Sequence, residues 1–72
     1  MNEIKQKKLA SSIVIKAMME TRKEKIDPYI SIGAFIDETI RELSKQNDDE
    51  KIALFLESIA EKVRMGIYRK KK

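Results

Sequence analysis

The stretch DPYISIGAFIDETIRELSK, residues 27–45, carries the clearest structural signal in the chain. Asp27 followed by Pro28 is typical of a helix start, because the aspartate can cap the first turn and the proline has no N–H to leave unpaired. Apolar residues then recur at spacings of three and four, and they are Tyr29, Ile32, Phe35, Ile36, Ile40 and Leu43. This spacing predicts an amphipathic helix over about 28–46.

A further helix is predicted over about 48–65, and both of its ends are marked. Asn47 and Glu50 have the spacing of a capping box, in which two side chains three residues apart each accept a backbone N–H. Gly66 lies where a left-handed C-cap is expected. The apolar face of this helix consists of Ile52, Phe55, Leu56, Ile59, Ala60 and Val63.

Leu54 and Met65 fall on the opposite, charged side of the same helix. Single exposed apolar residues are ordinary on a protein surface and need no function. Two on one side can also form the edge of a contact surface. We therefore take Leu54 and Met65 as candidate partner contacts, with the ordinary interpretation as the alternative.

The first predicted helix, about 3–24, is apolar around most of its circumference. Its apolar residues are Leu9, Ala10, Ile13, Val14, Ile15, Ala17, Met18 and Met19. Such a helix must be covered on nearly all sides, and two short amphipathic helices cover only one. We therefore predict a two-fold homodimer, and the candidate self-association residues are Leu9, Ile13, Val14, Ala17 and Met18. The alternative is a monomer in which this helix lies in the groove between the other two.

Short linkers near residues 25–27 and 46–48 favour antiparallel neighbours. We predict an all-α fold, a small up-down-up three-helix bundle completed by homodimerisation, with one domain over 1–68 and a basic disordered tail over 69–72. Seventy-two residues make one small domain with a limited core. Domains of this size are often stabilised by disulfides, a metal or oligomerisation. The chain has no Cys and no His, which leaves helix packing and self-association.

The composition also argues against an enzyme. Without His or Cys, the usual acid–base groups, nucleophile–base pairs and zinc ligands are missing. The two glycines form no phosphate-binding pattern, and the acids at 48–50 lack the spacing of a calcium loop. We expect no catalytic activity and no cofactor. The chain shows no signal-peptide pattern and no apolar stretch long enough to span a membrane, so we expect a cytoplasmic protein.

Charge placement suggests nucleic acid as an alternative partner. The formal net charge is +4, with basic ends and an acidic middle. In a symmetric dimer the basic ends could form one surface for phosphates. The candidate contacts are Lys5, Lys7, Lys8, Arg64, Arg69, Lys70, Lys71 and Lys72. Solvated chain ends are the plainer interpretation, so we rank a protein partner above nucleic acid. Membrane-surface binding ranks last, because the polar face of the 28–46 helix is acidic.

Residues 32–41, IGAFIDETIR, resemble the second helix of ribbon-helix-helix repressors. That family would imply DNA binding by a dimer whose strand lies near the start of the chain. Residues 11–16 alternate only in part between polar and apolar side chains. They also lie too close to Pro28 for an intervening helix and turn. The resemblance therefore covers one helix, and the all-α prediction is retained.

Overall fold

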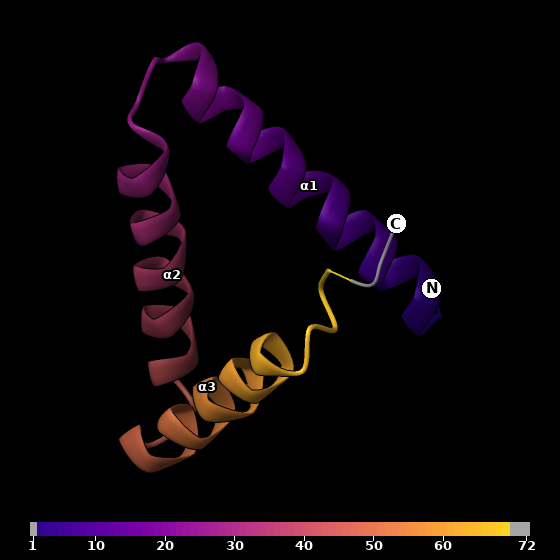
Figure 1. Ribbon diagram of the computed structural model, residues 1–72, viewed down its shortest axis with the longest axis vertical. Helices are drawn as coiled ribbons and strands as arrows, with labels where there is room; N and C mark the ends of the chain where they lie inside the picture. The colour runs from indigo at the N-terminus through magenta and orange to yellow at the C-terminus, as the bar shows by residue number, and fades with distance from the viewer. Residues whose placement is uncertain (1, 70–72) are drawn as a thin grey trace. The chain divides into compact units, whose positions relative to one another are not determined.

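The computed structural model describes residues 2–69, and within that range it contains three helices and no strand (Figure 1). Helix α1 spans Glu3–Lys23, α2 spans Pro28–Ser44 and α3 spans Asp49–Arg64. The predicted all-α class is confirmed, and each predicted helix end lies within two residues of the observed one. Residues 11–16 belong to α1, so the strand of a ribbon-helix-helix fold is not formed there. Lys70, Lys71 and Lys72, most of the predicted tail, lie outside the described residues.

The chain divides into two compact units, the first ending at Ile36 and the second beginning at Asp37. The first unit contains α1 and the first half of α2. The second unit contains the second half of α2 together with α3. Because the division falls inside α2, each unit is a pair of helical segments joined by a short turn.

The helix N-termini are capped by acidic or amide side chains. At α1, Asn2 Oδ1 accepts a hydrogen bond from the backbone N–H of Lys5 at 2.8 Å. At α2, Asp27 Oδ1 accepts from the N–H of Tyr29, also at 2.8 Å. This second bond agrees with the helix start predicted from Asp27 and the following proline. Each cap gives a partner to one of the backbone donors that a helix start leaves unpaired.

The capping box predicted from Asn47 and Glu50 is wrong. The N-cap of α3 is Asp48, whose Oδ1 accepts from the backbone N–H of Lys51 at 2.9 Å. Asn47 instead donates its side-chain Nδ2 to the carbonyl of Leu43 at 3.0 Å, and its backbone N–H bonds to the same carbonyl at 3.1 Å. The chain is still completing the last turn of α2 at Asn47, so this side chain serves the unpaired carbonyls of α2.

The C-terminus of α3 ends at a left-handed glycine, as the sequence predicts. Gly66 has φ 74°, and its N–H donates to the carbonyl of Val63 at 3.0 Å. The N–H of Ile67 reaches back to the carbonyl of Lys62 at 3.2 Å. These two bonds form a Schellman motif, which gives partners to the last carbonyls of the helix.

The C-terminus of α1 has the same hydrogen-bond pattern but no glycine. Lys25 occupies the left-handed position with φ 60°. Its N–H donates to the carbonyl of Arg22 at 2.9 Å, and the N–H of Ile26 donates to that of Thr21 at 3.1 Å. A lysine in this conformation is less favourable than a glycine, because its Cβ crowds the following carbonyl.

The buried core of each unit is small. In the second unit Ile52 is 7% exposed, and it is the one buried hydrophobic residue among those described. In the first unit the buried residue is Ser31, near the start of α2. There the end of α1 and the start of α2 line a cavity of about 100 Å³, whose walls include Met18, Thr21 and Phe35. Most of the apolar surface of both units is therefore still exposed.

Candidate protein-binding surface on α1

Helix α1 exposes most of the apolar residues that the sequence assigns to self-association. None of the residues Glu3–Lys23 is buried. Leu9 is 49% exposed, Ile13 58% and Val14 46%. Ala17 and Met18 are half-buried. The five candidates therefore divide into three side chains on an open surface and two that are partly covered.

The position of Met18 identifies the side of α1 that meets α2. Met18 lines the cavity shared with Ser31 and Phe35 at the start of α2. Ile13 lies five residues earlier, which places it about 140° away around the helix. Ile13 therefore points away from this contact, and Leu9 and Ala17 lie four residues to either side of it on the same strip.

We call this strip the outer face of α1, and define it as Gln6, Leu9, Ile13, Ala17 and Glu20. Its middle is apolar over about two helical turns, and both of its ends are polar. Such a strip has the width and length that a second helix can cover. The chemistry it offers is non-covalent helix–helix packing.

A second group of exposed apolar residues on α1 was not among the candidates. Ile4, Ile15 and Met19 are all exposed. They lie on a different side of the helix from Ile13, within about 60° of one another. Ile15 and Met19 belong to the apolar set read from the sequence, but periodicity could not rank them, because apolar residues surround almost the whole helix.

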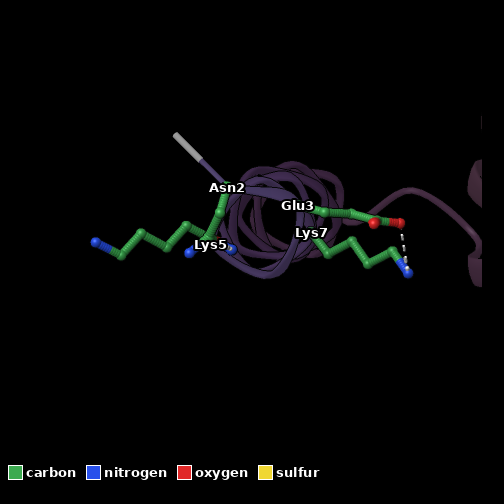
Figure 2. A network of polar contacts seen from close by, with 4 residues as sticks. All are labelled: Asn2, Glu3, Lys5 and Lys7. Carbon is green, nitrogen blue, oxygen red and sulfur yellow. Dashed lines mark hydrogen bonds and ion pairs between the residues drawn. The ribbon is translucent and has the colours of Figure 1, made fainter.

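The basic residues near the start of α1 point to different sides of the helix. Figure 2 shows Lys5 on one side and Lys7, next to Glu3, on the other. Lys7 Nζ lies 3.4 Å from Glu3 Oε2. Lys8 is exposed and about 60° from Lys5 around the helix. The first unit thus brings Lys5 and Lys8 near one side of α1 and leaves Lys7 apart from them.

The remaining described candidates for nucleic acid lie in the second unit. Arg64 Nη1 bonds to Glu61 Oε1 at 3.2 Å, and both side chains are largely exposed. Arg69 is also exposed. An exposed pair of this kind holds its cation only weakly, so Arg64 can still approach a phosphate. Lys70, Lys71 and Lys72 are outside the described residues.

Leu54 and Met65, the candidate partner contacts on α3, are both exposed. They lie on the same side of the helix but about 16 Å apart along its axis. Ser58 and Glu61 occupy the same side between them, and both are exposed. The two apolar side chains therefore do not form one continuous patch.

Across residues 2–69, no group of three or more Asp, Glu, His or Cys side chains is arranged to hold a metal ion. Within the same range, no helix has both the length and the apolar character needed to span a membrane. In the second unit, a cavity of about 250 Å³ is lined by Leu43, Asn47, Lys51, Ile52 and Phe55. Its lining is mainly apolar, with one amide and one ammonium group.

No family model matches the chain, and neither a curated protein nor a solved structure was found to be similar to it.

Proposed function

We propose that this chain is a non-enzymatic helical module that binds other proteins through helix–helix contacts, with a second copy of itself as one partner. The observation that carries the proposal is the exposure of Leu9 and Ile13 on a helix none of whose residues is buried. Apolar side chains of this size gain free energy when they leave water. A two-fold dimer would cover the same residues on both copies.

The free energies of apolar burial and of association favour a dimer whose population depends on protein concentration. Complete burial of a leucine or isoleucine side chain is worth about 1.5–3 kcal/mol. Leu9 and Ile13 are already about half covered, so the two pairs could add about 3–6 kcal/mol in a symmetric dimer. Association costs about 4–15 kcal/mol in lost translational and rotational freedom. Other exposed apolar residues must therefore also be covered in the dimer.

Within each copy we propose an up-down-up three-helix bundle, supported by the short turns at residues 24–27 and 45–48. The alternative is a monomer in which α1 is covered by the other two helices of its own chain. The two differ in whether the outer face of α1 is covered by another molecule. We also propose that the module acts in the cytoplasm, a compartment with which a fold free of cysteine is compatible.

The test is the solution mass of wild type and two charge variants across a hundredfold range of concentration. We expect wild type to dimerise and Ile13→Glu to remain monomeric, because a carboxylate would be desolvated at the interface. Lys8→Glu, about 140° from Ile13 around α1, is the matched control and should still dimerise. Circular dichroism checks that every variant keeps its helices. A helical wild type that stays monomeric at every concentration would refute the homodimer.

Nucleic-acid binding is the second candidate, supported by exposed Lys5 and Lys8 on one side of α1. Phosphate binding by such residues would weaken steeply with added salt. We would therefore titrate random duplex DNA at two salt concentrations, with wild type and a variant lacking residues 69–72. A complex that weakens with salt and with the truncation would move nucleic acid to first place.

A further inference from the structure

We infer that the second copy packs along the outer face of α1 in antiparallel orientation, with the two-fold axis passing beside Ile13. In this arrangement Leu9 of each copy packs against the partner's Ala17. The inference rests on the proposed homodimer and adds its geometry and register. The inference is drawn from the order of side-chain sizes and charges along the outer face.

The size of the side chains favours the antiparallel register. Leu9 and Ala17 lie four residues before and after Ile13, so a two-fold axis at Ile13 exchanges one with the other. A large side chain then faces a small one at both places, and two neighbouring helices keep an even separation. A parallel pair would instead set Leu9 against itself and Ala17 against itself, which leaves a gap at the alanines.

The charges favour the same orientation. Glu20 lies on the outer face, and Glu24, the C-cap residue, continues the strip one turn further. Both acids are near the negative end of their own helix dipole, where a carboxylate is unfavourable. A parallel pair would place these acids against their own copies. An antiparallel pair places Glu20 near the positive end of the partner's helix.

The N-terminal end of α1 offers suitable partners for these acids. Lys5 is the cation closest to the outer face at that end, and it extends away from the Glu3–Lys7 ion pair (Figure 2). With the axis at Ile13, residues 5 and 20 of different copies lie at nearly the same height along the helices. Glu20 of one copy can therefore meet the partner's Lys5.

Disulfide cross-linking tests the register cleanly, because the chain has no cysteine of its own. In the antiparallel pair, Ile13→Cys should link to itself under mild oxidation. Leu9→Cys alone should not, since the two copies of residue 9 lie about 12 Å apart along the axis, beyond the span of about 7 Å between Cα atoms that a disulfide allows. An equimolar mixture of Leu9→Cys and Ala17→Cys should give mainly the mixed dimer.

Each contrary outcome points to a different error. Efficient self-linking of both Leu9→Cys and Ala17→Cys would indicate a parallel pair and overturn the inference. A dimer in solution without links at residues 9, 13 or 17 would place the interface elsewhere, overturning the inference but leaving the proposed homodimer. A monomer at all concentrations would overturn both.

A charge exchange gives an independent measurement. Glu20→Lys should weaken dimerisation about tenfold, because it sets a lysine beside the partner's Lys5 at two symmetric places. Adding Lys5→Glu to the same chain should restore most of the loss. Lys8→Glu, on another side of α1, should not restore it. Equal effects of the two glutamate substitutions would contradict a specific contact between residues 5 and 20.

Discussion

Lys25 occupies a left-handed backbone position that a glycine would adopt at a lower cost in free energy. It has φ 60° and closes α1 with the same two hydrogen bonds that Gly66 forms at the end of α3. Its left-handed conformation costs free energy that glycine does not lose. This C-cap could not be predicted from the sequence, because lysine is not a residue that favours the left-handed region.

We predict that Lys25→Gly stabilises the protein by about 1 kcal/mol, because the hydrogen bonds remain and the unfavourable contact of Cβ disappears. This should raise the melting temperature by about 4–8 °C in a domain of this size. The control is the reverse change at the equivalent position, Gly66→Lys, which should lower it. Melting must be compared at one protein concentration. A lower melting temperature for Lys25→Gly would show that Lys25 has a contact that outweighs the strain.

At the scale of the helices, boundaries were easier to predict than orientations. The start of α2 follows from Asp27 and Pro28, and the end of α3 from Gly66, since each residue type favours one backbone role. The predicted N-cap of α3 was wrong by one residue. Asn47 and Asp48 are both good N-caps, and which of them caps α3 depends on where α2 ends. The side of α1 that meets α2 could not be predicted, because apolar residues nearly surround this helix and their spacing does not mark one face.

The corrected cap of α3 gives a prediction of its own. Asp48→Ala should cost about 1 kcal/mol of stability, because the N–H of Lys51 loses its partner at the helix start. Asp48→Asn keeps an accepting oxygen and should retain most of the stability. Chemical unfolding followed by circular dichroism measures both. If Asp48→Ala were as stable as wild type, Asp48 would contribute nothing as the N-cap.

For the whole molecule, the shortage of buried apolar residues is the dominant feature. Ile52 is the one buried hydrophobic residue within residues 2–69, whereas Leu9, Ile13 and many others remain exposed. A core this small supplies little of the free energy needed to order a chain of 72 residues. Stability should therefore come in part from association.

Association of folded copies makes thermal stability depend on concentration. We predict that the melting temperature of wild type rises by several degrees over a hundredfold increase in concentration, because mass action favours the folded dimer. Ile13→Glu should melt at nearly the same temperature at every concentration. Differential scanning fluorimetry with an external dye, or circular dichroism, can follow both. A wild type that melts independently of concentration would contradict a dimer that stabilises the fold.

The adjacent residues Ile13, Val14 and Ile15 have one further consequence, which concerns the unfolded chain. Three consecutive β-branched residues favour an extended backbone, and Lys16 is the first charge that follows them. When α1 melts, this segment can pair with its counterpart on other chains as an intermolecular strand, the first step of aggregation. Prompt refolding of this segment should therefore limit aggregation.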